Sequence, residues 1–215
     1  MSIDLRTTQI LEAAGPIFAD KGRKNATIRE ICAAAEVNLN AVNYYFGDKD
    51  NLYRESVRFA RESRADRHPF PKLDSVLCPK EKLAGFVETM LKRIVALGDA
   101  PWQVRLLMNE VLQPTDVCED LVEEYFRPVF ELLLGIVDEL SPRPLDSNQR
   151  KKIGFSIIGQ CIFYRYSRHV VSLFIEDQDD PDFAVKQLAS HISSFCIAAI
   201  ETGDTQASLK LIRQK

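Results

Sequence analysis

The chain of 215 residues carries 46% apolar and 27% charged side chains, a balance typical of a globular protein with a buried core. Its net charge of −3 excludes a uniformly basic protein that coats nucleic acid. No apolar run approaches the roughly 18 residues of a membrane span, and the N-terminus lacks the apolar core of a secretion signal, so we expect a cytoplasmic protein.

Short helices are predicted along the first 35 residues. Segment 5–21 places its apolar side chains at the three-and-four spacing of one helical face, and Gly22 is a common helix terminator. Thr27, followed three residues later by Glu30, forms the capping-box pattern that opens a second helix, predicted over 28–35.

The next signals place a turn and two further helices. Glu36 and Val37 make the turn, and Asn38 is a good N-cap for a third, short helix. Asp48 caps a fourth helix, longer and charged, which is predicted to run to residue 67. Residues 1–67 hold 11 Lys and Arg against 10 Asp and Glu, which allows nucleic-acid binding at this end without demonstrating it.

A proline-rich stretch over 68–79 is the best domain boundary in the chain, because prolines interrupt regular structure. No run of strand-like alternation occurs, so the second part is predicted to be helical as well. Its predicted helices are 80–97, 102–112, 117–140, 147–175 and 181–202. The predicted domains are therefore 1–67 and 80–202, joined by a linker over 68–79, with 203–215 as a frayed or disordered tail.

Two short helices joined by a tight turn form a helix-turn-helix, whose second helix enters the major groove of DNA. The third predicted helix suits this role, because its outward face carries asparagines and a leucine. Asparagine pairs with adenine edges, and leucine can touch a thymine methyl group. Taken singly such residues are more often structural, and Asn38 is a cap first. The predicted DNA contacts on this helix are Asn38, Leu39, Asn40, Asn43 and Tyr44.

Phosphate contacts are predicted on both sides of that helix. The Thr27 hydroxyl stands at the start of the second helix, where a phosphate oxygen can be held, and Tyr45 and Lys49 flank the other side. Lys49 also opens the fourth helix with a charge that opposes the helix dipole, which points to an external anion. In the structural alternative, Thr27 is only a cap and Tyr45 is half core.

Residues 5–53 resemble the DNA-binding domain of the TetR family of transcriptional repressors. The family pattern is F-x-x-x-G followed by T-x-x-x-I-A-x-x-A-G-V-S-x-x-x-x-Y-x-x-F-x-x-K-x-x-L. The residues that match it are Phe18, Gly22, Thr27, Ile31, Ala35, Val37, Phe46, Lys49 and Leu52. Three departures occur: Cys32 replaces alanine, Glu36 replaces the turn glycine, and the string Asn43-Tyr44-Tyr45 replaces Tyr-x-His. The string with its following Phe-Gly-Asp-Lys is similar to the CecR/YbiH-like subgroup.

The resemblance implies an all-α fold, with an N-terminal three-helix helix-turn-helix domain and a C-terminal helical bundle for dimerisation and ligand binding. It also implies a homodimeric repressor that binds a palindromic operator in double-stranded DNA and leaves it when a small-molecule effector binds, with no cofactor. No GxSxG, P-loop or HExxH motif occurs, so we do not expect an enzyme. The alternatives are an activator, a regulator without a small ligand, and a helical protein-interaction module.

The resemblance places the effector pocket among the middle helices, although aromatic and Met side chains there are more often core. The candidate pocket residues are Phe86, Met90, Trp102, Leu106, Phe126, Phe155, Gln160 and Tyr164. A buried Arg165 or Arg168 would require a partner. That partner is an anionic effector or one of Glu110, Glu123 and Glu124, unless these arginines lie in a dimer interface.

The last two long helices are the dimerisation pair in the family, and plain core packing would produce the same apolar stripes. The candidate interface residues are Phe163, Val170, Ile192, Phe195 and Ile200. Five cysteines at wide spacing, with no CxxC, favour free buried thiols over a redox sensor or metal site. Three histidines without ligand spacing argue against zinc.

Overall fold

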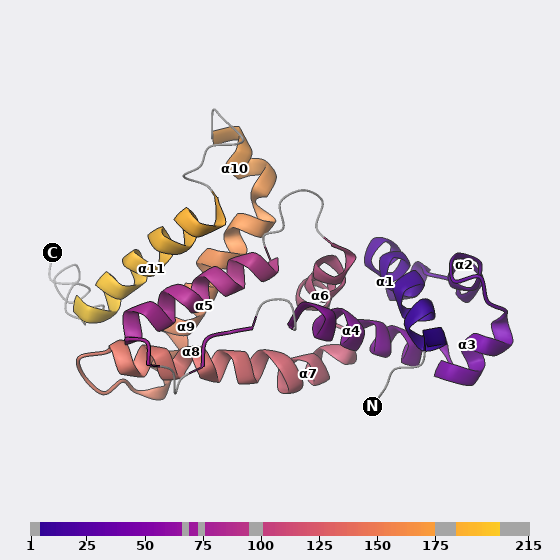
Figure 1. Ribbon diagram of the computed structural model, residues 1–215, viewed down its shortest axis with the longest axis horizontal. Helices are drawn as coiled ribbons and strands as arrows, with labels where there is room; N and C mark the ends of the chain where they lie inside the picture. Colours follow the sequence, from indigo (N-terminus) through magenta and orange to yellow (C-terminus); the bar gives the residue numbers. More distant parts are fainter. Residues whose placement is uncertain (1–4, 66–68, 73–75, 95–100, 175–183, 203–215) are drawn as a thin grey trace, which may run out of the picture. The chain divides into compact units, whose positions relative to one another are not determined.

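The computed structural model describes residues 5–65, 69–72, 76–94, 101–174 and 184–202 (Figure 1). The described residues form helices and connecting segments without a strand, which confirms the all-α class. By packing, the chain divides into two compact units, which are described separately. Unit 1 comprises Met1–His68 and Ala96–Phe126, and unit 2 comprises Pro69–Val95 and Arg127–Lys215.

Unit 1 contains the helix-turn-helix. Its elements are α1 (Leu5–Asn25), α2 (Ile28–Ala34), α3 (Leu39–Phe46), α4 (Lys49–Ala65), α6 (Trp102–Leu112), α7 (Val117–Leu121) and the π-helical turn η1 (Val122–Phe126). The predicted starts hold because each cap is a local hydrogen bond: the Asp48 carboxylate, for example, accepts from the Asn51 amide at 2.8 Å. Gly22, with φ 72° and ψ 164°, breaks the helical geometry of α1 near its end.

The core of unit 1 is built by α1, α4 and α6, which pack against one another. Phe18 of α1 is fully buried and meets the ring of Tyr53 of α4 edge-on, with ring centroids 5.0 Å apart. Leu106 of α6 is buried in the same cluster. Val42 and Phe46 attach α3 to this core.

The first packing unit ends at His68, next to the predicted boundary at 67, but it also includes Ala96–Phe126, a segment of the predicted second domain. Trp102 of α6 lies so close to Gly15 of α1 that a Cβ atom on Gly15 would come within 2.1 Å of the indole ring. Leu107 adds a further buried contact from α6. The helix-turn-helix therefore shares its core with residues far along the chain, and the functional boundary stays a prediction.

Unit 2 is a helical bundle of α5 (Pro79–Ile94), α8 (Arg127–Leu140), α9 (Ser147–Tyr166), α10 (Arg168–Phe174) and α11 (Val185–Thr202). Helix α5 packs against α8, α9 and α11 around a buried aliphatic core. The predicted helix 147–175 is divided at Ser167, and the predicted helix 117–140 is divided into α7, η1 and α8. The predicted tail 203–215 lies outside the described residues.

Part of the predicted linker 68–79 packs onto unit 2. The ring of Phe70 stacks on Phe86 with centroids 4.8 Å apart, and the guanidinium of Arg93 lies 4.0 Å from the centre of the Phe70 ring. Among the described helices, none is long and apolar enough to cross a membrane.

Candidate DNA-binding interface

The start of α2 is fixed by the predicted capping box. The Thr27 hydroxyl accepts a hydrogen bond from the Glu30 amide at 3.3 Å, and the Glu30 carboxylate accepts from the Thr27 amide at 3.1 Å. Hydrogen bonds from Lys21 and then from Thr27 hold the pKa of Glu30 below its usual value. A charged carboxylate therefore lies beside Thr27. The Thr27 hydroxyl is already used in the helix cap, as expected if Thr27 is only a cap.

The turn between α2 and α3 contains the one residue of the described chain, other than glycine, that has a positive φ. This residue is Glu36, with φ 51°, at the position where the family pattern has glycine. The left-handed conformation is costly for a residue with a Cβ atom. The turn thus keeps the geometry that glycine usually provides, at the expense of local strain.

Helix α3 presents a polar and aromatic surface over an apolar base. Its buried base is formed by Val42 and Phe46. Its outer face carries Leu39, 53% exposed, and Tyr44, 83% exposed, together with exposed asparagines at 40 and 43. Exposed leucine and tyrosine on a helix anchored in this way suit contact with another macromolecule.

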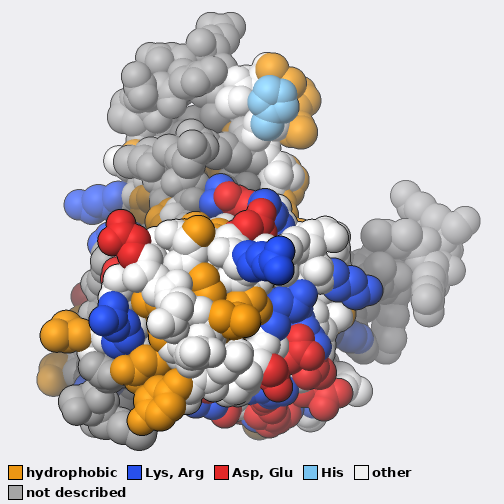
Figure 2. Space-filling view, turned by 90° about the vertical axis from the view of Figure 1, so that its right-hand side faces the viewer, with side chains coloured by type: hydrophobic (Ala, Val, Ile, Leu, Met, Phe, Trp, Pro, Cys, Tyr) orange, Lys and Arg blue, Asp and Glu red, His pale blue; other side chains and the backbone are white. Residues whose placement is uncertain are grey.

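Asn38 acts as the N-cap of α3, since its side chain accepts a hydrogen bond from the Ala41 amide at 2.9 Å. Tyr45 lies at the edge between the two faces, 36% exposed, with its ring edge-on to Tyr44 at 5.1 Å. Figure 2 views the molecule from the side on which Figure 1 places α2 and α3. Lys and Arg side chains are spread there among polar and hydrophobic ones, without one uniformly basic patch.

Lys49 is half-buried at the start of α4. Its ammonium donates to the carbonyl oxygens of Lys24 and Ala26, each at 3.3 Å. These acceptors are neutral, so they orient the ammonium without removing its charge. The carbonyl oxygens are therefore local partners of Lys49. The phosphate contact of Lys49 stays a prediction.

The sequence did not predict a polar network inside unit 1. Glu110 of α6 is fully buried, and it accepts hydrogen bonds from the Tyr53 hydroxyl and, at 3.1 Å, from the Thr115 hydroxyl. Burial first, and then the hydrogen bond to Glu110, raises the pKa of Tyr53. Glu110 was considered as a partner for Arg165 or Arg168, whose side chains lie outside the described residues. It instead links α4 to α6.

The predicted pocket residues are distributed over both units. Trp102, Leu106 and Phe126 pack with the core of unit 1, whereas Phe86 is buried in the core of unit 2, where Met90 and Tyr164 are partly buried against it. Phe155 is 62% exposed, although its ring stacks on Phe130. Gln160 donates a hydrogen bond to the Cys196 sulfur at 3.2 Å. Phe86 and Leu106 are thus core residues, and a pocket formed by the remaining residues stays a prediction.

The predicted dimer residues separate into two groups. Phe163, Val170 and Phe195 are at least half exposed. Ile192 and Ile200 are 1% and 5% exposed, because they face α5 and the rest of the unit 2 core. The assignment of these two isoleucines to a dimer surface is therefore wrong. Among the described residues, no cluster of His, Cys, Asp and Glu could hold a metal ion.

Comparison with known proteins gives the family. Residues 10–55 match the family model of bacterial regulatory proteins, tetR family. Residues 79–200 match the model of the C-terminal domain of the HTH-type transcriptional dual regulator CecR. The chain is 24% identical over 176 residues to the HTH-type transcriptional dual regulator CecR of Shigella flexneri, covering 77% of this chain and 78% of that protein.

Solved structures show the same fold. A TetR-like transcriptional regulator from Rhodococcus sp. RHA1 superposes with a TM-score of 0.66 at 19% identity, over 95% of this chain and all of that one. AibR, solved in complex with isovaleryl coenzyme A and operator DNA, also gives 0.66 at 15% identity, over 88% of this chain and 97% of that one. The chain belongs to the TetR family of transcriptional regulators, in the CecR-like branch.

Proposed function

We propose that this regulator represses transcription by occupying a palindromic operator as a homodimer, and that a small-molecule effector releases it. The observation that carries the proposal is the surface of α3. Leu39, Asn40, Asn43 and Tyr44 are exposed together on a helix whose other side is anchored by buried Val42 and Phe46. Such a helix can place amide and apolar groups against base edges in a major groove.

A homodimer is supported by the exposed face of α9. Phe155, Gly159, Phe163 and Tyr166 follow one another at helical spacing, and all four are exposed. Apolar side chains in a continuous stripe mark an interaction surface. Phe195 of α11, 61% exposed, adds to the apolar surface of the same unit. Two copies joined at α9 would present two recognition helices to a palindrome.

Release by an effector requires that the effector prefer the conformer that binds DNA poorly. A coupling of about 1–3 kcal/mol would weaken operator binding roughly 5- to 150-fold. A protein of this fold, AibR, has been solved with both an acyl-coenzyme A and operator DNA, so acyl-coenzyme A thioesters are a reasonable first class to screen. Titration of the effector against a fixed operator complex tests this step.

The decisive experiment is selection from a pool of random duplex DNA, followed by sequencing of the retained fraction. A palindromic consensus is the expected result. Asn43→Ala should relax base preference at defined positions of that consensus, whereas Lys49→Ala should weaken binding to all sequences about equally. No enrichment at low salt, from protein shown to be folded, would contradict the proposal and favour a helical protein-interaction module.

A further inference from the structure

The two ends of α3 are held in different ways. At its end, the carbonyl of Phe46 accepts from the Asn51 side-chain amide and from the Asp48 main-chain amide, each at 2.9 Å. Gly47 follows α3 with φ 76°, a value that glycine adopts without strain. The exit from α3 is therefore fixed by two hydrogen bonds and by a residue that suits the turn.

The turn before α3 is strained and is held from α1. Glu36 has a φ of 51°, which is costly for a residue with a Cβ atom. The side-chain amide of Gln9 in α1 donates to the carbonyl of Ala35, the residue directly before Glu36, at 2.8 Å. Ala35 is only 2% exposed, so loss of the Gln9 amide would remove a donor from a buried carbonyl.

Gln9 is itself held in a defined orientation. The next two residues, Ile10 and Leu11, are buried in the core of unit 1 and fix this part of α1. The side-chain oxygen of Gln9 accepts from the Arg6 guanidinium at 3.2 Å. The amide nitrogen is then the group that faces Ala35. A side chain outside the helix-turn-helix thus links the core of the unit to its strained turn.

We propose that Gln9 is a positioning residue for DNA recognition, which keeps the turn at Glu36 in the conformation that orients α3 on the operator. Helix α3 packs against α2 and α4, so its direction depends on the turns at its two ends. Without the hydrogen bond to Ala35, Glu36 can relax toward a negative φ and move the start of α3, where Leu39 and Asn40 lie. The inference rests on the DNA binding proposed above.

Gln9→Met tests this role, because methionine keeps the length and helix propensity of the side chain but cannot donate a hydrogen bond. The readout is discrimination, which is the ratio of affinity for the selected operator to affinity for operators changed at single bases. One hydrogen bond corresponds to roughly a 2- to 10-fold change in an equilibrium constant, so discrimination should fall by about that factor. Unchanged discrimination would overturn the proposal.

The Glu36→Gly background separates positioning from direct contact of Gln9 with DNA. Glycine adopts the positive φ without strain, so the turn has no strain to release when Gln9 is replaced. Gln9→Met should therefore reduce discrimination less in this background than in the wild type. An equal reduction in both backgrounds would overturn the positioning role and indicate that Gln9 touches DNA itself.

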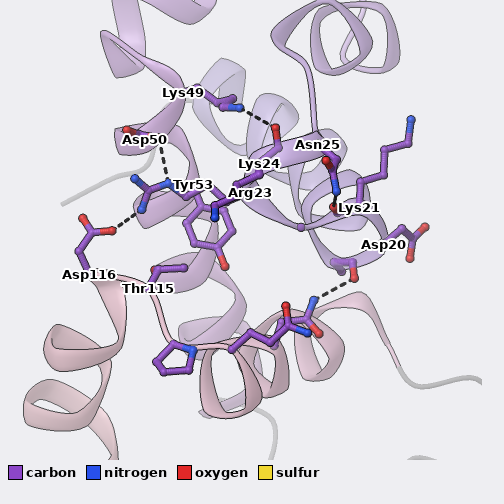
Figure 3. A pocket seen from close by; sticks show the side chains of 15 residues that line it. Asp20, Lys21, Arg23, Lys24, Asn25, Lys49, Asp50, Tyr53, Thr115 and Asp116 are labelled. Carbon is purple, nitrogen blue, oxygen red and sulfur yellow. Dashed lines mark hydrogen bonds and ion pairs between the residues drawn. The ribbon is translucent and has the colours of Figure 1, made fainter.

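Asn109→Leu is the matched control. Asn109 of α6 lines the groove of unit 1 drawn in Figure 3, and its side-chain amide donates to the carbonyl of Ala19 in α1 at 3.0 Å. The same kind of hydrogen bond is removed, but one that joins α6 to α1. This variant should lower the melting temperature, as Gln9→Met does, and leave discrimination unchanged. An equal loss of discrimination in both variants would indicate general loosening of unit 1 and would overturn the inference.

A wild type that selects no operator would contradict the proposed function, and the orientation of α3 is then tested in the DNA-free protein. Two-dimensional NMR follows the amides of residues 36–46 in each variant, with circular dichroism to confirm folding. Gln9→Met should shift these amides in the wild-type background, less so with Glu36→Gly, and Asn109→Leu should leave them in place. Amides that do not shift in Gln9→Met would overturn the inference.

Discussion

Substituting Gly15 by alanine tests the close packing of α1 against α6. Alanine in a helix interior is favoured over glycine by about 1 kcal/mol, so helix propensity alone predicts a more stable protein. The structure predicts the reverse. A Cβ atom at position 15 would lie 2.1, 2.3 and 2.5 Å from three carbons of the Trp102 ring.

The Trp102 ring would have to move to relieve this clash, and its stacking on Phe59 limits that movement. The ring must move by about 1.3 Å to bring the shortest approach from 2.1 to the 3.4 Å of ordinary contact, and it is stacked on Phe59 with centroids 6.3 Å apart. Overpacking of this kind costs about 1–3 kcal/mol. After the gain in helix propensity of about 1 kcal/mol, Gly15→Ala should lower the free energy of unfolding by up to about 2 kcal/mol.

The measurement is urea unfolding followed by far-UV circular dichroism and by fluorescence, since Trp102 is the single tryptophan of the chain. Gly85→Ala in α5 is the matched control, because its Cβ would meet only Pro71 at an ordinary 3.7 Å, and it should stabilise. In a Trp102→Leu background, Gly15→Ala should also become stabilising. A stabilising Gly15→Ala in the wild-type background would refute the packing described for Trp102.

Three further changes test the turn, the buried network and the dimer surface. Glycine at position 36 adopts the positive φ without strain, so Glu36→Gly should raise the free energy of unfolding by about 1 kcal/mol, measured by thermal unfolding. Glu36→Ala removes the charge but keeps the strain, so it should not stabilise the protein. Equal effects of the two substitutions would contradict a strained turn. The raised pKa of Tyr53 keeps the folded phenol protonated above about pH 10, where the unfolded chain ionises, so stability should fall as pH rises beyond that value. Tyr53→Phe should abolish this fall and cost about 1–3 kcal/mol at neutral pH, and a retained fall would assign it to another group. Phe163→Glu should weaken the dimer about tenfold or more in analytical ultracentrifugation, and an unchanged association would remove Phe163 from the interface.

Local signals in the sequence were sufficient for the helix-turn-helix. The caps at Thr27, Asn38 and Asp48 were predicted and found, because each is a hydrogen bond between a side chain and an amide two or three residues away. The strain at Glu36 was also detectable, as a glutamate at a glycine position of the family pattern. Nothing local, however, indicates that Gly15 must admit a ring from residue 102, since the two are joined only by the tertiary fold.

Helix α11 carries a stripe of buried residues and one exposed aromatic side chain, Phe195. Residues 188, 192, 196 and 200 repeat every four positions and form the buried stripe, whereas Phe195 lies outside that stripe and is exposed. A single apolar helix therefore carries a core face and a separate surface aromatic. Phe195 follows Ile192 by three residues, so the helical period alone does not separate the two, and their different burial follows from how α11 packs in unit 2.

Several arginines of unit 1 are paired with acidic residues of the same unit. Arg23 and Arg54 both pair with Asp116, and Arg61 pairs with Glu124 at 2.9 Å, so these arginines join α1 and α4 to α7 and η1. They are committed to packing within the unit, and few cations remain for phosphates. Nonspecific attraction should then be modest, because it scales with phosphate contacts. Selectivity would rest on the side chains of α3, where the exposed asparagines lie, and on the two-fold repetition of the site in a dimer.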